Sequence, residues 1–457
     1  MSKFDAIIIG AGQAGPPLAD RLNRAGMTVA LIERNLLGGT CVNTGCTPTK
    51  TLVASAYAAH LARRAADYGV STGEVSVDMR RVKARVDEVV TNSRKGLEGW
   101  LQSMERVTLI HGHASFESAN TIRVGDTQLT ASRFFLNVGA RALVPNLPGV
   151  DRVPYLVNTS ILALDRVPKH LAVVGGSYIG LEFAQAFRRL GSEVTVIEKA
   201  PRLISREDED VSEAIREIFK RESIGVRTSA ECIRLAPDPN GVAVGVDCQE
   251  GPPQVIASDV LLAVGRVPNT GDLGLDRAGV AMDARGYIPV DDSLATNVPG
   301  IWAIGDCNGR GAFTHTSWND YEIVAANLLD GEHRKVSDRI LGYALYIDPP
   351  LGRVGQTEAQ VRASGRKYSV GMRPMSRVSR AIEKGEAQGL MKILVDDVTQ
   401  RILGAGILGV GGDEAIHGVL DMMNADAPYP VLKWAVPIHP TVSELIPTLL
   451  NELRPGS

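Results

Sequence analysis

The stretch Phe4–Gly15, which reads FDAIIIGAGQAG, decides the fold. A short apolar run ends in glycines spaced G-x-G-x-x-G, and a helical pattern and a second apolar run that closes on Glu33 follow it. The same order returns in His170–Gly180 (HLAVVGGSYIG), and it closes on Glu198 at the same spacing from the first glycine. Two copies in one strand–turn–helix–strand context predict two α/β units of the same type.

Each position of this glycine motif has a physical role in binding a dinucleotide. The first glycine makes a tight turn, the second lets the backbone approach a pyrophosphate, and the third lets helix and strand pack closely. The pyrophosphate would sit at a helix amino terminus, where N–H groups and the helix dipole favour negative charge. Ser177 replaces the middle glycine of the second copy and narrows the space for the pyrophosphate there. The glycines are Gly10, Gly12, Gly15, Gly175 and Gly180. Glu33 and Glu198 would each bind a ribose, so the sequence predicts two bound dinucleotides.

The composition excludes several other classes of protein. The chain has 457 residues, 44% hydrophobic and 22% charged, which is typical of a globular protein of two to four domains. The net charge of -3 leaves no basic excess for a nucleic-acid partner. Apolar runs are too short to span a bilayer, and MSKFDAIIIG is no signal peptide. Five cysteines cannot form the disulfide framework of a secreted protein, so we expect a cytoplasmic protein without a membrane partner.

The order of the motifs predicts the domain organisation. Residues 1–150 form the first dinucleotide unit with a helical insertion, and residues 151–270 form the second. Residues 271–337 contain a strand that ends in Asp306 (IWAIGD). Residues 338–457 lack a glycine motif and mix strands with helices, which indicates an α+β domain.

A second feature, Gly38–Lys50 (GGTCVNTGCTPTK), carries two cysteines at the entry to a helix. In a regular helix the Cα atoms of Cys41 and Cys46 would lie about 7.5 Å or more apart, beyond the usual range for a disulfide. Gly45 could supply the distortion that brings them together. A helix amino terminus lowers the pKa of a thiol, and Lys50 shares a helical face with Cys46. The alternatives are two inert thiols or half of a zinc site, for which two further ligands of suitable spacing are missing.

GGTCVNTGCTPTK resembles the redox-active disulfide motif of the class I pyridine nucleotide-disulfide oxidoreductases, which include lipoamide dehydrogenase, glutathione reductase and mercuric reductase. The resemblance runs from Phe4 to about Leu450 and rests on five further motifs. These are Gly10–Gly15 with Glu33 for FAD, Gly175–Gly180 with Glu182 for the nicotinamide cofactor, Gly265–Asn269 at the close of the nicotinamide domain, Ile304–Asp306 as the second FAD motif, and His439–Glu444 as the carboxy-terminal catalytic signature. The resemblance implies a glutathione-reductase-like α/β fold, with two Rossmann-like domains for FAD and NAD(P) and an α+β dimerisation domain.

The resemblance also implies a path for electrons. NAD(P)H would pass a hydride to FAD, and the flavin would reduce a Cys41–Cys46 disulfide. Cys46, nearer the flavin, would be the charge-transfer thiolate, and Cys41 the thiol that attacks the substrate. Lys50 would approach flavin N5 and pair with Glu182, since a cation there stabilises negative charge on reduced flavin.

A proton must also move, and the resemblance assigns this role to His439, oriented by Glu444. Histidine suits general acid–base catalysis because its ordinary pKa lies near neutrality. In the family this pair comes from the partner subunit, which implies a homodimer with shared active sites.

Further cofactor contacts are carried over from the matching motifs. Asp306 would hold the ribityl chain, and the backbone of Ala114 would contact the FAD adenine. The remaining expected contacts are Gly39, Thr40, Lys50, Gly139, Gly265 and Arg266. Glu198 suits a free 2′-hydroxyl and so favours NADH, whereas Lys199 and Arg202 could admit NADPH.

Other candidate residues are expected to be ordinary. His111 and His113 alternate on a predicted strand and are too few for a metal site, so no metal site is predicted. Cys232 and Cys248 are expected to be inert. Cys307 directly follows Asp306, and a redox role for it stays open.

The electron acceptor is the least determined feature. The prolines that follow Gly15 disfavour glutathione as the substrate. The last residues, Asn451–Ser457, contain no cysteine pair, which disfavours a standard mercuric reductase. Thr47–Ser55 and Phe313–Tyr321 depart from lipoamide dehydrogenase and resemble a mercuric-reductase-like group, some of whose members reduce Hg(II) or Cu(II). Two functions therefore remain: reduction of a small disulfide, quinone or thiophilic metal ion, and the lipoamide dehydrogenase subunit of a 2-oxoacid dehydrogenase complex.

Overall fold

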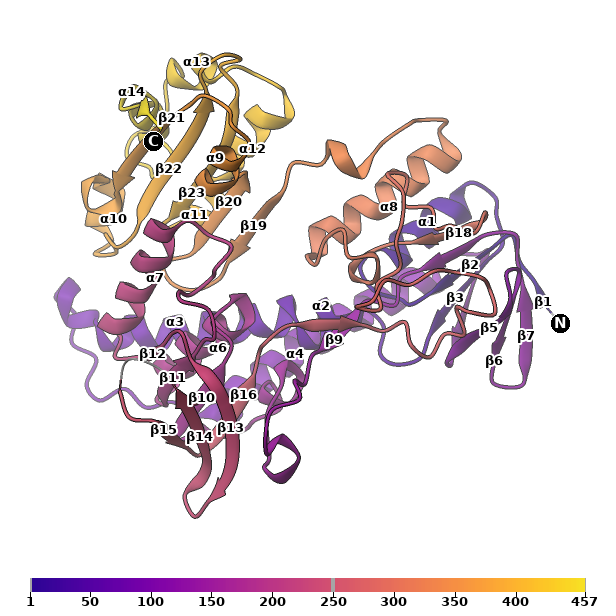
Figure 1. Cartoon of the computed structure of the whole chain (residues 1–457), viewed down its shortest axis with the longest axis horizontal. Coiled ribbons are helices and arrows are strands. Elements are labelled where there is room, and N and C mark those ends of the chain that lie inside the picture. Colours follow the sequence, from indigo (N-terminus) through magenta and orange to yellow (C-terminus); the bar gives the residue numbers. More distant parts are fainter. Residues whose placement is uncertain (1, 248–250, 457) are drawn as a thin grey trace. The chain divides into compact units, whose positions relative to one another are not determined.

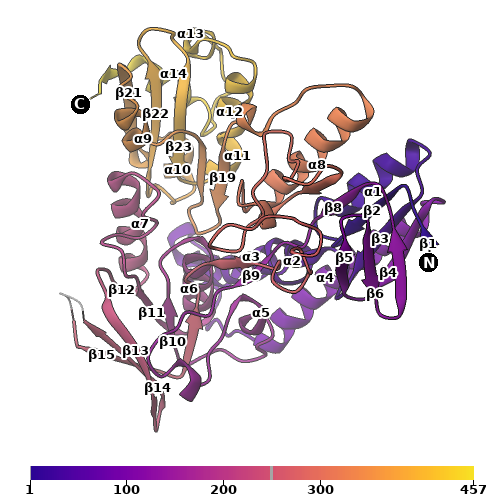
Figure 2. The ribbon, with the colours of Figure 1, turned by 45° about the vertical axis from the view of Figure 1, so that its right-hand side comes forward.

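The computed structural model describes residues 2–247 and 251–456. The described chain divides into two compact units, each made from three separate stretches of sequence. The first contains residues up to 51, 83–143 and 265–339, and the second contains residues 52–82, 144–264 and 340 onward. Figures 1 and 2 show mixed helices and strands throughout, in agreement with the predicted α/β class.

The first unit is built on a parallel five-stranded sheet in the order β18-β8-β2-β3-β4. Its elements are β2 (Ala6–Ile9), β3 (Val29–Glu33), β4 (Val107–His111), β8 (Phe134–Leu136) and β18 (Ile301–Ala303), with helices α1 (Gly15–Arg24), α2 (Gly39–Thr44) and α8 (Thr314–Leu329). Side chains of β2 alternate between two cores, as the period of a strand requires. Ala6 and Ile8 pack with α1 and α8, while Ile7 and Ile9 face the opposite core.

Short strands complete the first unit. A second sheet, in the order β1-β7-β6-β5, packs on the face opposite α1. Its strands are β1 (Ser2–Lys3), β5 (Ala114–Ser118), β6 (Thr121–Val124) and β7 (Thr127–Thr130). Strand β17 (Arg266–Pro268) pairs with β9 (Ala140–Ala142), so the chain re-enters the first unit at Gly265.

The second unit begins with the second glycine motif. Its four-stranded parallel sheet has the order β12-β11-β10-β16, and a three-stranded antiparallel sheet follows, β13-β14-β15. The elements are α5 (Asn158–Ile161), β10 (His170–Val174), α6 (Tyr178–Leu190), β11 (Glu193–Ile197), α7 (Glu209–Arg221), β12 (Gly225–Arg227), β13 (Glu231–Asp238), β14 (Gly241–Asp247), β15 (Gln254–Ala257) and β16 (Asp259–Leu262). Parallel strands with crossover helices give the predicted strand–helix–strand order.

The carboxy-terminal stretch forms a six-stranded sheet in the order β19-β20-β23-β22-β21-β24. Its elements are β19 (Gly342–Leu345), β20 (Leu351–Gly355), α9 (Glu358–Ala363), β21 (Tyr368–Pro374), α10 (Ser379–Glu383), β22 (Leu390–Asp396), β23 (Ile402–Leu408), α11 (Gly412–Ala415), α12 (His417–Asn424), α13 (Tyr429–Lys433), α14 (Leu445–Asn451) and β24 (Arg454–Pro455). This confirms the expected mixture of strands and helices. Two long helices, α3 (Cys46–Arg63) and α4 (Met79–Gln102), have residues in both units and form the predicted helical insertion.

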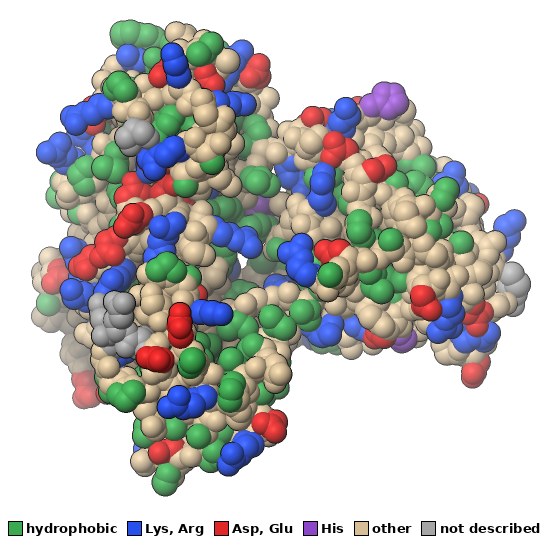
Figure 3. All heavy atoms as spheres, viewed as in Figure 1, with side chains coloured by type: hydrophobic (Ala, Val, Ile, Leu, Met, Phe, Trp, Pro, Cys, Tyr) green, Lys and Arg blue, Asp and Glu red, His purple; other side chains and the backbone are tan. Residues whose placement is uncertain are grey.

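The surface carries no single dominant charge on the face drawn in Figure 3, where basic and acidic side chains are interspersed. Among the helices of the described residues, none combines the length and the apolar character needed to cross a bilayer.

Candidate active site

The first glycine motif forms a tight turn between β2 and α1. Gly10 has a φ of +104°, and a Cβ there would collide with the carbonyl oxygen of Asn137. A Cβ on Gly15 would collide with the carbonyl oxygen of Gly10, so the third glycine lets the helix start close to the strand. Glu33 closes the motif: its carboxylate accepts hydrogen bonds from Ala11 N at 2.9 Å and Asn35 N at 2.8 Å.

The second motif repeats this geometry in the second unit. Gly175 has a φ of +117°, and a Cβ on Gly180 would collide with its carbonyl oxygen. The carboxylate of Glu198 accepts hydrogen bonds from Gly176 N at 2.5 Å and Ala200 N at 2.7 Å. Both closing glutamates are therefore held by the backbone of their own glycine loops.

The first loop has the shape that a flavin dinucleotide needs. A Cβ on Gly39 would lie 2.9 Å from Gly12 Cα, so the backbones of these two glycines approach closely, and the N-cap residue of α1, Ala14, provides no side-chain cap. The buried Nε of Arg266 has no hydrogen-bond partner among the described residues. A close approach of glycine backbones, a helix amino terminus and a spare buried donor fit the binding of FAD.

Arg266 lies between Asp306 and Thr40 in the first unit. Its Nη2 is 3.5 Å from the Asp306 carboxylate and 3.4 Å from Thr40 Oγ1. Burial raises the pKa of Asp306, and the charge of Arg266 opposes that shift. Because β17 pairs with β9, Gly265 and Arg266 lie beside the segment that contains Gly139. The Gly139 carbonyl accepts the Asn269 N–H at 3.0 Å. Ala114 lies in β5 of the same unit and is 2% exposed.

Asn137 is a site residue that sequence reasoning missed. Its Oδ1 accepts the Gly15 N–H at 3.0 Å and its Nδ2 donates to Ile304 O at 3.1 Å, so it joins the glycine loop to the turn before Asp306. Its position in the sequence could have identified it, because it is a polar residue directly after the buried strand β8, at the strand end where open α/β sheets bind ligands.

The two cysteines lie on either side of a break in the helix. Helix α2 ends at Thr44 and α3 begins at Cys46, so Gly45 provides the expected distortion. A Cβ on Gly45 would lie 2.8 Å from Thr40 O, which explains the need for glycine. Cys41 and Cys46 are free thiols that hydrogen-bond to one another, and this bond, followed by burial, raises the pKa of Cys41.

A third side chain, Thr314 at the start of α8, also reaches the thiols. Its hydroxyl lies 3.3 Å from Cys46 Sγ. Cys46 is the first residue of the 18-residue helix α3, and the dipole of that helix favours a thiolate there.

The predicted lysine and glutamate belong to different units. Lys50 lies on α3, one turn after Cys46. Glu182 lies on α6, is 5% exposed, and accepts the Tyr346 N–H at 3.0 Å. The pairing of Lys50 with Glu182 stays a prediction.

His439 and Glu444 are brought together as expected. His439 Nδ1 lies 2.9 Å from Glu444 Oε2, while the His439 side chain is 75% exposed. The whole segment from Trp434 to Pro440 is exposed, and it includes Val436 at 96% and Ile438 at 79%. Exposed apolar side chains around a polar pair are typical of a surface that another protein chain covers.

Three weaker candidates have ordinary environments. Cys307 is fully buried in the core, its Sγ donates to Leu136 O at 3.3 Å, and burial raises the pKa of its thiol to about 12, which makes a redox role unfavourable. His113 Nε2 lies 2.9 Å from Asp272 O. In residues 2–247 and 251–456, no group of three His, Cys, Asp or Glu side chains could hold a metal ion. Cys232 is exposed, and Cys248 lies outside the described residues.

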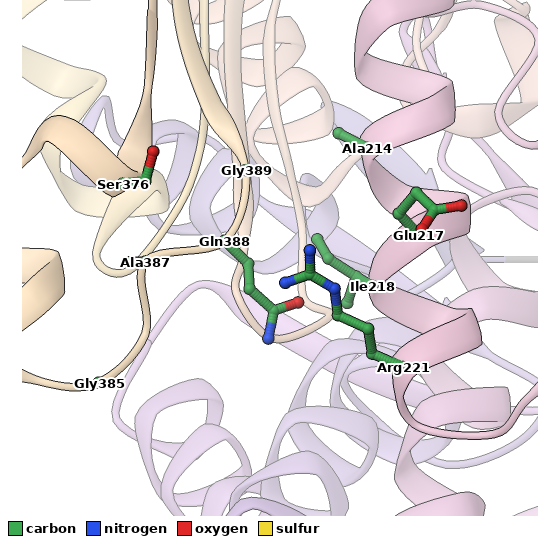
Figure 4. Close-up of a pocket in the computed structure, with 9 residues that line it drawn as sticks. All are labelled: Ala214, Glu217, Ile218, Arg221, Ser376, Gly385, Ala387, Gln388 and Gly389. Atoms are coloured by element: carbon green, nitrogen blue, oxygen red, sulfur yellow. The ribbon is translucent and has the colours of Figure 1, made fainter.

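An open cavity of about 570 Å³ lies away from these residues, in the second unit (Figure 4). Glu217, Ile218 and Arg221 of α7 line one side and Gln388 lines the other. None of the predicted site residues lines it.

Known proteins resemble this chain over nearly its whole length. Probable pyridine nucleotide-disulfide oxidoreductase RclA of Escherichia coli is 37% identical over 99% of this chain and 100% of that protein. A dihydrolipoyl dehydrogenase of Cupriavidus necator is 34% identical over 98% of this chain and 97% of its own. A mercuric reductase of Bacillus cereus is 34% identical over 91% of this chain and 66% of the reductase.

A solved structure and two family models agree with these relatives. The Cu(II) complex of the HOCl-induced flavoprotein disulfide reductase RclA from Escherichia coli has a TM-score of 0.90 and 36% identity over 99% of both chains, which confirms the predicted glutathione-reductase-like fold. The family model described as pyridine nucleotide-disulphide oxidoreductase matches residues 4–320, and that of the family's dimerisation domain matches residues 342–450. The chain therefore belongs to the pyridine nucleotide-disulphide oxidoreductase family, and it is a flavin-dependent enzyme whose cofactors are FAD and NAD(P)H.

Proposed function

We propose that the enzyme uses NAD(P)H to reduce a small disulfide or a thiophilic metal ion, such as Cu(II), through Cys41 and Cys46. The observation that carries this proposal is the contact between the two thiols at the amino terminus of α3, with Thr314 beside them. Two thiols that lie in contact can reduce a disulfide by exchange, and thiolates are the preferred ligands of soft metal ions.

The two cysteines have different roles in this proposal. Cys46 carries the negative charge, because the α3 dipole and the hydrogen bond from Cys41 both stabilise a thiolate. Cys41 keeps its proton until a base removes it, since its pKa is raised. Cys41 then attacks the substrate, and Cys46 closes the internal disulfide as the product leaves. This assignment agrees with the roles implied by the resemblance.

The balance of electrons is complete for either substrate class. Oxidation of the two thiols to a disulfide releases two electrons and two protons. These convert one substrate disulfide into two thiols, or two Cu(II) ions into two Cu(I) ions. The loop closed by Glu33 would hold FAD, whose chemistry is to pass on the two electrons of an NAD(P)H hydride. The Cys41–Cys46 disulfide would take up these electrons with two protons, one from the hydride and one from solvent, and so become the dithiol again.

His439 is the proposed base in a homodimer. Its Nδ1 is bonded to Glu444, so Nε2 stays available for a proton, and its side chain is exposed within the apolar segment Trp434–Pro440. A second copy of the chain would cover that segment and receive His439 at its own thiols. This arrangement is supported by the match of residues 342–450 to a dimerisation domain.

The proposal extends to the two nucleotide sites, the domains and the compartment. FAD would bind the loop closed by Glu33, and NAD(P)H the loop closed by Glu198. We propose the domain limits 1–150, 151–270, 271–337 and 338–457. A pair of functional thiols suits the reducing cytoplasm.

A second candidate is dihydrolipoyl dehydrogenase. The His439–Glu444 hydrogen bond favours it over reduction of a metal ion, because exchange with a dithiol or disulfide needs a proton at the sulfur, whereas electron transfer to a metal ion does not. A relative of that name is 34% identical over 98% of this chain.

The deciding experiment measures anaerobic NADH and NADPH oxidation by the purified holoenzyme. Lipoamide, glutathione disulfide, Cu(II), Hg(II) and a quinone are compared as acceptors, with Cys41→Ser as the matched control. We expect turnover with Cu(II) or a small disulfide that Cys41→Ser abolishes. Turnover that is highest with lipoamide supports the second candidate, and equal turnover of the parent and Cys41→Ser with every acceptor contradicts both.

A further inference from the structure

The turn of residues 37–39 leads into α2, the helix that carries Cys41. Gly38 and Gly39 have φ values of +95° and +60°, a region of the backbone that favours glycine. Helix α2 has six residues, Gly39–Thr44, and none of them is buried. A helix this short is not stable by itself, because nucleation costs more than so few hydrogen bonds return. The contacts at its ends therefore determine where Cys41 lies.

The turn is bonded to the first glycine motif through both polar groups of Gly38. Gly38 N donates to Ala11 O at 2.9 Å, and Gly38 O accepts a hydrogen bond from Gln13 Nε2 at 3.1 Å. The backbones also come close here, since a Cβ on Gly39 would lie 2.9 Å from Gly12 Cα. Among these contacts the hydrogen bond from Gln13 is made by a side chain, so a substitution can remove it and leave the backbone contacts in place.

A second side-chain amide, that of Asn43, holds the turn from the side of α2. Asn43 Nδ2 donates to Leu37 O and to Gly39 O, both at 2.9 Å. Three successive carbonyls, those of residues 37–39, thus accept hydrogen bonds from side-chain amides. Asn43 joins the turn to its own helix, whereas Gln13 joins the turn to the first glycine motif.

Cys46 is held by other residues than Cys41. It begins the 18-residue helix α3, and Thr314 Oγ1 lies 3.3 Å from its Sγ. Helices α2 and α3 are separate at Gly45, so they do not move as one rigid rod. Cys41 nevertheless contacts Cys46. That contact consequently depends on how firmly α2 is attached to the first glycine motif.

We propose that Gln13 is a positioning residue for Cys41, which it keeps within reach of Cys46 by holding the turn of residues 37–39 on the first glycine motif. This inference rests on the proposed function, because it takes Cys41 and Cys46 as the redox-active pair. Two thiols form a disulfide only at close range and in a narrow geometry. A turn that is ordered before the bond forms spares the entropy of ordering it, so the Gln13 hydrogen bond favours the disulfide over the dithiol. The loop proposed to hold FAD thereby also holds the attacking thiol.

The test measures the disulfide equilibrium of the holoenzyme in anaerobic mixtures of reduced and oxidised dithiothreitol. When the Cys41–Cys46 disulfide forms, one oxidised dithiothreitol takes up the two electrons and two protons and becomes the dithiol. Alkylation of the free thiols and mass spectrometry of the peptides give the equilibrium constant. Gln13→Met keeps the length of the side chain and removes its N–H donors. We expect the constant for disulfide formation to fall about fivefold, the effect of one neutral hydrogen bond.

Hydrogen–deuterium exchange of residues 37–44 gives a second measurement, which needs no reaction. The Gly38 N–H should exchange about fivefold faster in Gln13→Met than in the parent, since the turn opens more often. FAD content should stay as in the parent. A loss of FAD that accounts for the faster exchange would give Gln13 a role in cofactor binding instead and overturn the proposal.

Two further variants serve as controls. Gln128→Met is the same substitution in the first unit, where Gln128 Nε2 donates to Glu117 Oε2 at 2.7 Å in the β5-β6-β7 sheet. Its equilibrium constant and its exchange at residues 37–44 should equal those of the parent. Gln13→Lys keeps an N–H donor at position 13 and should stay close to the parent. If Gln13→Lys behaves like Gln13→Met, the hydrogen bond to Gly38 is not the cause and the proposal fails.

A role of Gln13 in stability alone would give a different result. Gln13→Met would then have a lower melting temperature with a parent-like equilibrium constant and parent-like exchange, which overturns the proposal. If Gln13→Met does not fold, Gln13→Asn replaces it, because its amide is one methylene shorter and no longer reaches Gly38 O. Parent-like values in that variant reject the proposal. A parent enzyme whose Cys41 and Cys46 form no disulfide in any of the mixtures refutes the proposed function itself.

Discussion

The imidazole of His439 and the carboxylate of Glu444 form a hydrogen bond, with Nδ1 2.9 Å from Oε2, in a segment where His439 is 75% exposed. A carboxylate at Nδ1 fixes the tautomer, so that Nε2 is the nitrogen that accepts or donates a proton. The Glu444 N–H in turn donates to Thr441 Oγ1 at 3.2 Å, which holds the carboxylate in place. An exposed and preformed acid–base pair is what the proposed site shared between two subunits needs.

His439→Ala should therefore lose turnover while keeping its flavin chemistry. We expect FAD content and flavin reduction by NAD(P)H like those of the parent, but turnover with disulfides lower by about 10²–10⁴-fold. Turnover with Cu(II) should fall much less, since a metal ion needs no proton on a leaving sulfur. Steady-state rates with both acceptors measure this. Parent-like rates with disulfides would remove His439 from the mechanism.

Mixing His439→Ala with Cys41→Ser chains tests the shared site. Each heterodimer should regain one working site, which has an intact thiol pair and an intact His439 from different chains. Heterodimers that form but have no activity would contradict the arrangement.

The cysteine pair should show opposite spectra in its two serine variants. Two-electron reduction of the parent should give a long-wavelength charge-transfer band from the Cys46 thiolate to the flavin. Cys41→Ser leaves that thiolate unable to form a disulfide, so its band should appear without reductant, whereas Cys46→Ser should have none. Absorption spectra of the purified variants measure this, and two variants that both behave like the parent would refute the disulfide assignment.

Glu198 should make the enzyme prefer NADH. Its carboxylate is fixed by Gly176 N and Ala200 N, and its charge would repel a 2′-phosphate. Glu198→Gln should raise the ratio of kcat/KM for NADPH over NADH about tenfold. Glu193→Gln, which changes an 80% exposed carboxylate on the same sheet, should leave the ratio as it is. A parent enzyme with a tenfold preference for NADPH would refute the expected role of Glu198.

Asn137→Ala should weaken FAD binding and destabilise the protein. It leaves Gly15 N and Ile304 O without the bonds that join the glycine loop to the turn before Asp306. We expect a loss of about 1–3 kcal/mol in the free energy of unfolding and partial loss of FAD on dilution. Asn297→Ala is the control, because that amide is exposed and bonds to Ala281 N at 2.9 Å. Equal stability of the two variants would rule out the bridging role.

His60 should make the protein sensitive to acid. Burial, followed by the charge of Arg189, lowers the pKa of His60 below its ordinary value of 6.5. In the unfolded chain the residue takes up a proton as the pH falls below 6.5, while in the folded protein it stays neutral until a lower pH, so stability is lost in that window. The free energy of unfolding of the parent, measured with urea, should fall as the pH is lowered through 6.5. His60→Gln should lose less of this free energy over the same pH range. The exposed His417→Gln should behave like the parent.

The sequence by itself determined the two glycine motifs, the thiol pair and the His439–Glu444 pair. Each of these is local: glycine spacing, closing glutamates and the five-residue step from His439 to Glu444 specify geometry over a few turns of chain. For the same reason the break at Gly45 could be anticipated from the spacing of the cysteines.

Only the tertiary structure decided which distant residues meet these motifs. Asn137 reaches Gly15 across 122 residues, Thr314 reaches Cys46 across 268, and Arg353 reaches Glu207 across 146. It also placed Arg266 beside Asp306, because β17 pairs with β9, and showed Cys307 to be a core residue. Such contacts depend on strand pairing and packing between segments far apart in the chain. Neither the period of the hydrophobic residues nor the spacing of residues within a motif predicts them.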